Sequence, residues 1–382
     1  MHPVLERLKS EVEARRQAGL GRELLPVSER RGTTVVLDGR EYLDFSSNDF
    51  LGLARDADAA ARMGELCRSL GSGAGASRLV TGTSASVLEA EHALAGYFGY
   101  ESCLILGSGF LANLTLIATL FSEKDALALD KRAHTSTVAG VRHSRAQFHT
   151  FRHNRLGHLR KILEAHPVQA VLTESLFSMD GDSPDFTQLR ELKEEFGFLG
   201  IVDEAHALGV LGPGGRGLGR EAADVAVGTL GKAFGLFGAF ILCPGIVREH
   251  LLHFGQGFIY TTALPPWHGD MVLAMLERVA AADEARERLR SLGDEARKML
   301  GETLPVRGEA HILALEVGDE TRCQELAAAL RRMGILVFAA RYPTVPLGQA
   351  ILRVCMSSGH TEGDLARLRD ALVDAQGAEA RT

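Results

Sequence analysis

Short apolar runs alternate with amphipathic stretches through the middle of the chain. Each run is short enough to be a buried strand, and the stretches between them have the length and periodicity of helices, as at 187–196. The predicted strands lie at 103–106, 126–130, 170–174, 201–202, 225–227 and 239–242. Because strands that alternate with helices usually pair in parallel, this pattern predicts an α/β domain built on a mostly parallel, doubly wound sheet.

The two ends of the chain follow other patterns. Residues 4–18 predict a charged amphipathic helix, and residues 35–45 predict a hairpin whose Asp38-Gly39 pair suits a type I′ turn. A long helical stretch over 267–300 leads into a tail that mixes strands and helices, which is typical of a smaller α+β domain. The predicted division is an N-terminal arm (1–46), a large domain (47–280) and a C-terminal α+β domain (281–382).

Composition narrows the classes of function. Of the 382 residues, 46% are hydrophobic, which is enough to bury a large core in two or three lobes. The formal net charge of −7 argues against nucleic acid as a main partner. The five cysteines form no C-x-x-C pair, so neither a disulfide framework nor a zinc site is expected. No apolar stretch has the length of a membrane span and the N-terminus does not look like a signal peptide, so we expect a cytoplasmic protein without a membrane partner.

Three histidines have spacings that a metal site could use. His149, His153 and His158 are separated by four and five residues. Histidines at helical spacing without a matching carboxylate are more often surface residues than ligands. We therefore predict no metal.

One lysine follows a predicted strand at a place where a functional role is plausible. The apolar run 225–227 predicts a buried strand, and Lys232 lies on the glycine-rich turn after it. A lysine amine that is removed from water has a lowered pKa and becomes a nucleophile able to react with an aldehyde cofactor. The glycines of the turn would let the backbone approach a bulky ligand closely. The alternative is an ordinary surface lysine.

A second predicted strand ends in a carboxylate. Asp203 closes the apolar run 201–202, and His206 follows three residues later. Parallel strands open on the same carboxyl edge of the sheet, which is where such folds bind ligands. A carboxylate at this edge can keep a pyridinium nitrogen protonated while Lys232 carries the aldehyde. Together these residues predict a site for pyridoxal phosphate, whose electronics a protein tunes through the ring nitrogen.

Two glycine-rich segments bear on this interpretation. Residues 71–76 match the loose dinucleotide pattern G-x-G-x-x-A, but residues 65–70 before them look helical, so the strand that the motif requires is missing. Residues 107–113 follow a predicted strand and open a helix, where free backbone N–H groups can bind a phosphate. The alternative for 107–113 is a plain strand-to-helix turn.

Taken in order, these residues resemble the α-oxoamine synthases, a family of pyridoxal phosphate enzymes with the aspartate aminotransferase fold. The resemblance spans about residues 4–375. It rests on Ser-Asn-Asp-Phe-Leu-Gly (47–52), Gly-Ala-Ser-Arg-Leu-Val-Thr-Gly (75–82), Gly-Ser-Gly-Phe-Leu-Ala-Asn (107–113), Asp-Lys-Arg-Ala-His (130–134), Thr-Glu-Ser-Leu-Phe-Ser-Met-Asp-Gly-Asp (173–182), Val-Asp-Glu-Ala-His (202–206), Thr-Leu-Gly-Lys (229–232), Tyr-Thr-Thr-Ala-Leu-Pro-Pro (260–266) and Pro-Thr-Val-Pro (343–346). It implies fold type I, with a seven-stranded sheet in the large domain, and a homodimer with shared active sites.

The segment 77–82 resembles the branch of the family that joins L-alanine to a pimeloyl thioester in biotin biosynthesis. The resemblance implies that the amino acid takes the place of Lys232 on the cofactor, that Lys232 removes the Cα proton, and that condensation releases the thiol and CO₂. The thioester would be carried by coenzyme A or by a carrier protein. The alternatives are another member of the family, for example one that uses glycine and acetyl-CoA, a simple aminotransferase, and a catalytically idle protein that acts only by binding.

The resemblance also implies roles for single residues at the cofactor. His134 would stack on its ring and Asp203 would pair with its nitrogen. The remaining cofactor contacts would be Lys232 at the aldehyde, His206 and Ser178 at the phenolic oxygen, Gly109, Phe110 and Thr229 at the phosphate, and Thr262 at the phosphate of the neighbouring subunit. Lys232, His134, Asp203 and His206 would form the catalytic set.

One substrate residue is also marked by the pattern itself. Arg353 is a lone basic residue in the apolar strand 351–355, where an unpaired charge is costly. A structural aspartate is one explanation. The resemblance instead directs Arg353, with Asn48 and His134, to the amino acid, and Arg22 and Thr344 to the acyl substrate. The sequence departs from the family pattern at Val87, Ala207-Leu208, Phe237 and Gln256-Gly257, none of which falls on a cofactor residue.

Overall fold

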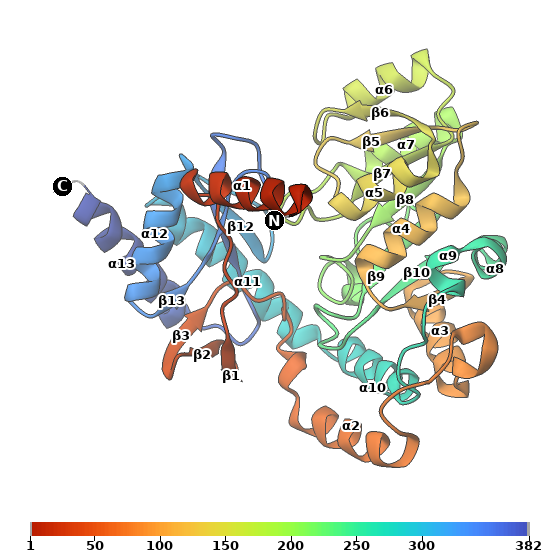
Figure 1. The fold of residues 1–382 in the computed structure, drawn as a ribbon, viewed down its shortest axis with the longest axis horizontal. Coiled ribbons are helices and arrows are strands. Elements are labelled where there is room, and N and C mark those ends of the chain that lie inside the picture. Colours follow the sequence, from red (N-terminus) through yellow and green to blue (C-terminus); the bar gives the residue numbers. More distant parts are fainter. Residues whose placement is uncertain (1, 380–382) are drawn as a thin grey trace.

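The computed structural model describes residues 2–379 and contains a seven-stranded sheet in the order β4-β10-β9-β8-β7-β5-β6 (Figure 1). The strands are β4 (Ser102–Leu106), β5 (Ala126–Asp130), β6 (Gln147–Phe151), β7 (Ala170–Glu174), β8 (Leu199–Asp203), β9 (Val225–Thr229) and β10 (Ala239–Cys243). Only β10 runs antiparallel to its neighbours, β4 and β9. The expected mostly parallel α/β sheet is confirmed.

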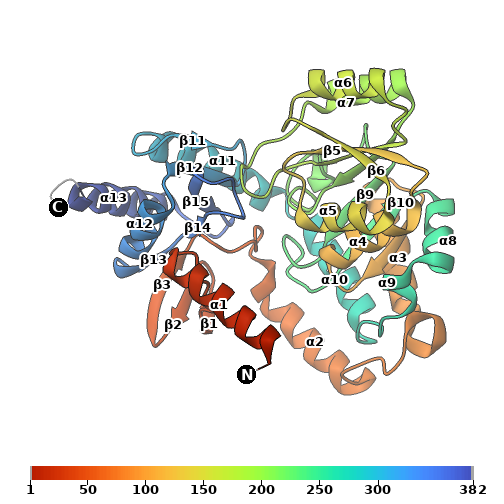
Figure 2. The ribbon, with the colours of Figure 1, turned by 45° about the horizontal axis from the view of Figure 1, so that its top comes forward.

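Helices cover both faces of this sheet (Figures 1 and 2). The helices of this domain are α3 (Ala85–Phe98), α4 (Gly109–Leu120), α5 (Thr135–Ser144), α6 (Leu156–Ala165), α7 (Phe186–Phe196), α8 (Gly245–Phe254), α9 (Gln256–Ile259) and α10 (His268–Ala280). Helix α2 (Ala57–Leu70) packs on α10 rather than on the sheet. Along β10, Phe240 and Leu242 pack in one core cluster while Ile241 and Cys243 pack in the other. A strand that is buried on both faces needs apolar residues at every position, which explains the unbroken apolar runs in the sequence.

Strand β6 was not predicted from the sequence. It lies at the end of the strand order and pairs only with β5. Its residues, Gln147 to Phe151, are largely exposed, and only Phe151 is buried. The faces of β6 are solvent-exposed, whereas β4 at the opposite edge of the sheet is buried, so β6 lacks the apolar run that marked the other strands.

The second lobe contains two smaller sheets. One has the order β11-β12-β15-β14 and the other β1-β2-β3-β13. The strands of these sheets are β1 (Val27–Arg31), β2 (Thr34–Leu37), β3 (Arg40–Asp44), β11 (Val306–Arg307), β12 (Ile312–Gly318), β13 (Ile335–Leu336), β14 (Phe338–Ala340) and β15 (Ala350–Cys355). The helices of the lobe are α11 (Asp283–Gly301), α12 (Glu320–Arg332) and α13 (Glu362–Glu379). The β2–β3 turn has positive φ at Asp38 (51°) and Gly39 (74°), as a type I′ turn requires. Since β3 pairs in parallel with β13, the hairpin is joined to the C-terminal lobe. The three-part domain division remains a proposal.

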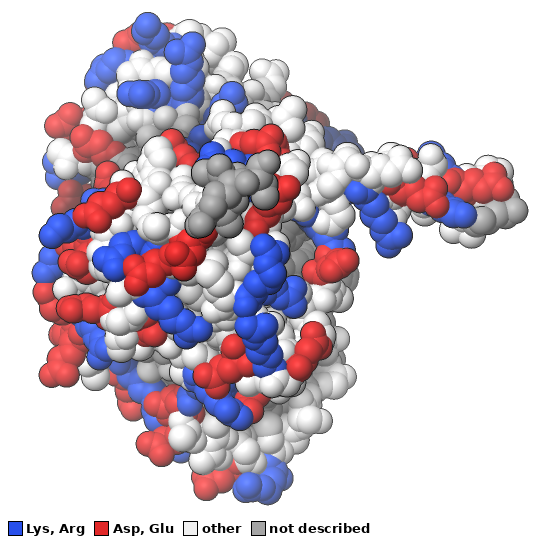
Figure 3. Space-filling model, turned by 90° about the vertical axis from the view of Figure 1, so that its left-hand side faces the viewer, with Lys and Arg blue, Asp and Glu red and all other residues white. Residues whose placement is uncertain are grey.

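Helix α1 (Pro3–Gln17) stands away from the rest of the molecule, as the arm at the right of Figure 3 shows. None of its residues is buried. Its apolar face carries Val4, Leu5, Leu8 and Val12, each between 43% and 52% exposed. An apolar face of this kind is typical of a segment that packs on another surface. Within residues 2–379, no helix is both long and apolar enough to cross a bilayer.

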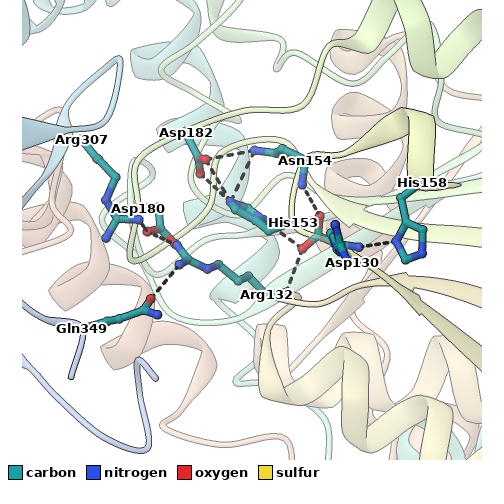
Figure 4. Close-up of polar contacts among 10 residues, drawn as sticks. Asp130, Arg132, His153, Asn154, His158, Asp180, Asp182, Arg307 and Gln349 are labelled. Carbon is teal, nitrogen blue, oxygen red and sulfur yellow. Dashed lines mark hydrogen bonds and ion pairs between the residues drawn. The ribbon is translucent and has the colours of Figure 1, made fainter. Parts of the chain in front are cut away.

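A buried polar network ties the large domain to the C-terminal lobe (Figure 4). Arg132, after β5, and Arg307, on β11, both form ion pairs with Asp180, which is only 3% exposed. Beside them, the ring of His153 bonds Asp130 (3.0 Å) and Asp182 (2.9 Å). The ligand atoms of His153, Asp180 and Asp182 lie close enough to hold a metal ion. Since positively charged side chains already pair with these carboxylates, we assign no metal there.

The His153 pairs should make the stability of the fold depend on pH. Burial lowers the pKa of His153, but the hydrogen bonds and charges of Asp130 and Asp182 outweigh burial and raise it to about 9. A histidine whose pKa is higher in the folded state stabilises that state fully below its unfolded value of about 6.5. This contribution is lost as the pH rises through about 9. The thermal stability lost in His153→Gln should therefore be large near neutral pH and shrink in alkali.

The control for this measurement is His149→Gln. His149 lies on β6, four residues before His153, and its pKa is lowered by burial and by the charge of His166. Its replacement should cost little stability near neutral pH. An unfolding midpoint of His153→Gln that lies a constant interval below that of the wild type at every pH would contradict the assignment of a charged His153.

Candidate active site

Five strand ends meet at the carboxyl edge of the large sheet and place the predicted residues together. The register aligns Glu174 with Asp203 and Asp203 with Val227 in the parallel part of the sheet. Leu106, at the end of β4, lies opposite the first residue of the antiparallel β10, so β4 ends at the same edge. The loops that leave these ends carry Gly109, His134, Ser178, His206 and Lys232. The fold thus gathers at one edge residues that are up to 123 positions apart.

Lys232 contacts His206 directly. The distance from Lys232 Nζ to His206 Nε2 is 2.7 Å. Burial lowers the pKa of Lys232 to about 8, against the opposing charges of Asp203 and Glu174. Burial and the charge of Lys232 lower the pKa of His206 well below its usual value, so His206 is neutral and its Nε2 can accept a hydrogen bond from the amine. The surface-lysine alternative is not supported by this environment, and a lysine with a lowered pKa is suited to nucleophilic attack on an aldehyde.

Asp203 is held by donors on both oxygens. Asn113, on α4, donates to Asp203 Oδ2 (2.7 Å), and the backbone N–H of Ala205 donates to Oδ1 (3.0 Å). His134 lies nearby as the N-cap of α5, where burial lowers its pKa and the charge of Asp203 opposes that effect. The charge of Lys232 also lowers the pKa of His134, and the charge of Asp203 raises that of Lys232, so the three side chains lie close together.

The N-terminus of α4 opens toward free space. Ser108 is its N-cap, and a Cβ built on Gly107 or Gly109 would meet no atom within 4 Å. Phe110 is 48% exposed. An accessible helix N-terminus with free N–H groups binds phosphate well. Thr229, at the end of β9, accepts from the N–H of Gly231 (3.1 Å) and donates to the carbonyl of Gly238 (3.2 Å).

Arg353 has neutral partners rather than a carboxylate. It lies on β15 and is 5% exposed. Its Nε donates to the carbonyl oxygen of Ser178 and its Nη2 donates to Asn48 Oδ1 (3.1 Å). Among the described residues no ion pair compensates its charge. The explanation by a structural aspartate therefore fails, and a buried guanidinium without a counterion is suited to bind a carboxylate.

A third residue connects the segments that contain Arg22 and Thr344. Both are exposed. Arg341 donates to the carbonyl of Gly21 and accepts through its own carbonyl from the N–H of Thr344 (2.8 Å). Arg341 thus holds the segment before β1 against the loop that contains Thr344. The structure brings the two segments together, but no contact of Arg22 is seen within residues 2–379.

Thr262 lies in the loop between α9 and α10, beside the end of β4. It is exposed and forms a bridge with Ser77. Thr262 lines a small cavity together with Gly107, Val87 and Gly257. Two of the positions that depart from the family pattern, Val87 and Gly257, therefore share this cavity.

The other two departures lie elsewhere. Phe237 is 66% exposed at the surface. Ala207 and Leu208 are buried in the core, where Leu208 packs beneath Gly228. These residues affect packing or the surface rather than the cavity.

Sequence reasoning assigned no role to Glu174 or His311. Glu174 ends β7, is 4% exposed and has one oxygen without a partner, and burial together with the charge of Asp203 raises its pKa well above the usual value. His311 precedes β12, and its ring packs edge-on against that of Phe50 with 4.1 Å between the ring centroids. Burial and the charge of Arg353 lower the pKa of His311 to about 3. Glu174 lies in the family motif 173–182 and at the end of a predicted strand, so the sequence could have marked it as a candidate site residue. His311 is brought to the site only by the second lobe.

The donor set fits pyridoxal phosphate. The amine of Lys232, with its lowered pKa, suits the aldehyde of that cofactor. The carboxylate of Asp203, fixed at a strand end, suits the ring nitrogen, and the open N-terminus of α4 suits the phosphate. His206 Nδ1 is buried and has no partner among the described residues, so it is free to donate to or accept from a bound group. The same edge offers Arg353 for the carboxylate of an amino acid.

Comparisons with known proteins agree with this chemistry. Residues 40–372 match the family model described as aminotransferase class I and II. The 8-amino-7-oxononanoate synthase of Gluconacetobacter diazotrophicus is 40% identical over 371 residues, which is 93% of each chain, and that of Vibrio atlanticus is 35% identical over 97% of this chain and 93% of its own.

Solved structures show the same fold. The serine palmitoyltransferase of Sphingomonas wittichii has a TM-score of 0.91 and 26% identity, with 98% of each chain covered. The 8-amino-7-oxononanoate synthase of Francisella tularensis has a TM-score of 0.77 and 28% identity over 89% of this chain and 99% of its own. A serine palmitoyltransferase mutant of S. paucimobilis, with a TM-score of 0.91, 26% identity and 98% of each chain covered, was solved with pyridoxal phosphate bound.

Proposed function

Since the chain belongs to the aminotransferase class I and II family, and within it to the α-oxoamine synthases, we propose that it is an 8-amino-7-oxononanoate synthase. It is a pyridoxal phosphate enzyme that condenses L-alanine with a pimeloyl thioester and releases CO₂ and the free thiol. The observation that carries this conclusion is the 35–40% identity to proteins of that name over more than nine tenths of the chain.

Each residue of the site is assigned one role in the reaction. Bound pyridoxal phosphate supplies an electron sink for the charge that develops at Cα of the amino acid. Lys232, as a free amine, takes up the Cα proton, and neutral His206 at 2.7 Å keeps that amine in place. Asp203 offers its carboxylate to the ring nitrogen. Arg353 orients the amino acid by its carboxylate.

The remaining assignments are part of the same proposal. His134 stacks on the cofactor ring and meets the substrate, while Ser178 and His206 bond its phenolic oxygen. The phosphate contacts are Gly109, Phe110 and Thr229, with Thr262 from the neighbouring subunit. Asn48 supports Arg353, to which it is already bonded at 3.1 Å. Arg22 and Thr344 meet the acyl substrate, which suits the joining of their segments by Arg341.

A substrate panel tests the proposal. Purified protein loaded with pyridoxal phosphate is assayed for thiol release with L-alanine or glycine against acetyl, pimeloyl and longer acyl thioesters, on coenzyme A and on a carrier protein. We expect L-alanine and a pimeloyl thioester to give the highest kcat/KM. Preference for glycine and acetyl-CoA would identify another α-oxoamine synthase. Absence of turnover with every pair would support the remote alternative of a protein that only binds.

Arg353 and Arg22 should separate the two substrates. Arg353→Ala should raise the KM for L-alanine more than tenfold and leave thioester binding nearly unchanged, because loss of a buried charged hydrogen bond costs about 2–5 kcal/mol. Arg22→Ala should raise the KM for the thioester only. Steady-state kinetics with each substrate varied in turn measures both effects. If Arg353→Ala weakens only the thioester, the orientation of both substrates must be reversed.

We also propose a homodimer that shares its active sites. The exposed apolar face of α1 and the exposed position of Thr262 support it, because both suit burial by a second copy. Inactive Lys232→Ala protein mixed with a Thr262→Ala variant should regain part of the wild-type activity, because each hybrid dimer contains one site with both residues intact. A fully active monomer in sedimentation at assay concentration would rule out the shared site.

A further inference from the structure

Four side chains form a continuous hydrogen-bonded chain from Asp203 to His134. Asn113 Nδ2 lies 2.7 Å from Asp203 Oδ2 and 3.1 Å from Ser136 Oγ. Ser136 Oγ lies 2.7 Å from His134 Nδ1. The residues come from the end of β8, from α4 and from the first turn of α5, and Asn113 and Ser136 are 3% and 0% exposed. We refer to Asn113 and Ser136 as the relay.

The direction of every bond in the relay follows from which groups can donate. An ionised carboxylate can only accept, so the atom of Asn113 that faces Asp203 is its NH₂ group. The second hydrogen of that NH₂ group points to Ser136 Oγ, which accepts it. The hydroxyl hydrogen of Ser136 is then free to be donated to His134 Nδ1.

The helix N-cap fixes the same tautomer independently. The backbone N–H of Ser136 also donates to His134 Nδ1, at 3.3 Å. Two donors converge on Nδ1, so this nitrogen carries no hydrogen and the proton of the neutral ring lies on Nε2. Burial lowers the pKa of His134, in agreement with a neutral ring.

We propose that Asn113 and Ser136 are positioning residues that act through Asp203 and His134. Asn113 holds the carboxylate of Asp203 in the orientation that a ring nitrogen needs, and Ser136 holds His134 as the Nε2–H tautomer, with its donor left for the ligand. The residue expected to stack on the cofactor ring and the residue expected at its nitrogen are thereby connected through the relay. The proposal rests on the proposed use of pyridoxal phosphate but not on the identity of the acyl substrate.

The first test needs no cofactor. Nitrogen-15 NMR of the cofactor-free protein, labelled at histidine, distinguishes a nitrogen with a hydrogen from one without. We expect the His134 signals, identified by their loss in His134→Gln, to show hydrogen on Nε2 only. Ser136→Ala should move them toward a mixture of the two tautomers, whereas Ser144→Ala, which removes a buried hydroxyl at the other end of α5, should not. Unchanged His134 signals in Ser136→Ala would overturn the tautomer assignment.

The second test uses the loaded enzyme and L-alanine alone. Exchange of the alanine α-hydrogen with solvent should slow about tenfold or more in Asn113→Leu, a loss typical of residues that orient a functional group from behind. The KM for L-alanine should change little, because Arg353 is intact. The matched control is Thr115→Val, also on α4, 4% exposed and without a partner at Oγ1 among the described residues.

The outcomes separate the proposals. The relay would be overturned if Asn113→Leu exchanged the alanine α-hydrogen within twofold of the wild-type rate and its His134 NMR signals were also unchanged. If Asn113→Leu does not fold, Ser136→Ala alone decides through its NMR signals. A failure of the pimeloyl thioester assay leaves both relay tests intact, because neither contains a thioester.

Discussion

Replacing Lys232 by alanine is expected to lower the rate of condensation by at least about 10²–10⁴-fold, the range for loss of a general base. The loss should be near the upper end, because Lys232 is also the amine expected to bind the aldehyde of the cofactor. Its burial and the 2.7 Å contact with His206 mark it as the group that takes the proton. Initial rates with saturating L-alanine and thioester measure the effect.

A covalent label makes this prediction specific. Borohydride treatment of the loaded wild-type protein should leave the cofactor attached to the peptide that contains Lys232, and no label should form in Lys232→Ala. The control is Lys131→Ala, an exposed lysine directly after β5, at the same edge of the sheet. Normal turnover by Lys232→Ala, or labelling of a different peptide in the wild type, would overturn the assignment of this residue.

The Asp203→Asn variant should bind pyridoxal phosphate but abstract the α-proton of L-alanine about 10²–10³-fold more slowly, as when one group that stabilises developing charge is lost. Asparagine keeps the shape, and its single carbonyl oxygen can still accept from one of the two donors, Asn113 or Ala205, so the fold should survive. It cannot keep a ring nitrogen protonated, so the electron sink weakens. Absorbance reports cofactor binding, and hydrogen exchange at Cα reports the chemical step.

Comparing the rates of α-hydrogen exchange in Asp203→Asn and Asn113→Leu separates the effect of the charge from the effect of its orientation. Removal of the charge should cost more than removal of the group that orients it, so exchange should be slower in Asp203→Asn. Exchange at the wild-type rate in Asp203→Asn would show that Asp203 does not pair with the ring nitrogen.

Much of the large sheet and of the site could be predicted from local sequence. Strands that are buried on both faces are apolar at almost every position, so β4, β7 and β9 could be predicted from short apolar runs. Lys232 and Asp203 could be predicted as site residues because each follows such a run. Residues 107–113 were predicted to open a helix, and Ser108 acts as its N-cap in the structure. Strand β6 was missed because its residues are mostly exposed, unlike those of β4 at the opposite edge of the sheet.

Other features depended on contacts between distant segments. The partners of Arg353, Ser178 and Asn48, are 175 and 305 positions away, and sequence alone left a structural aspartate as an alternative explanation. The relay joins α4, α5 and the end of β8, and none of these segments carries a local pattern that specifies the pairing. Side-chain bonds of this kind depend on distance and angle across packed elements.

The sequence by itself determined the class of sheet, the edge at which the chemistry lies and the lysine and carboxylate that mark it, because backbone periodicity and strand burial are local properties. Tertiary structure decided which donors hold Asp203, which tautomer His134 adopts and whether the charge of Arg353 is compensated. It also decided that the pKa of Lys232 falls and that of His153 rises. Those properties come from burial and from charges brought together by folding, and a linear chain contains neither until it is packed.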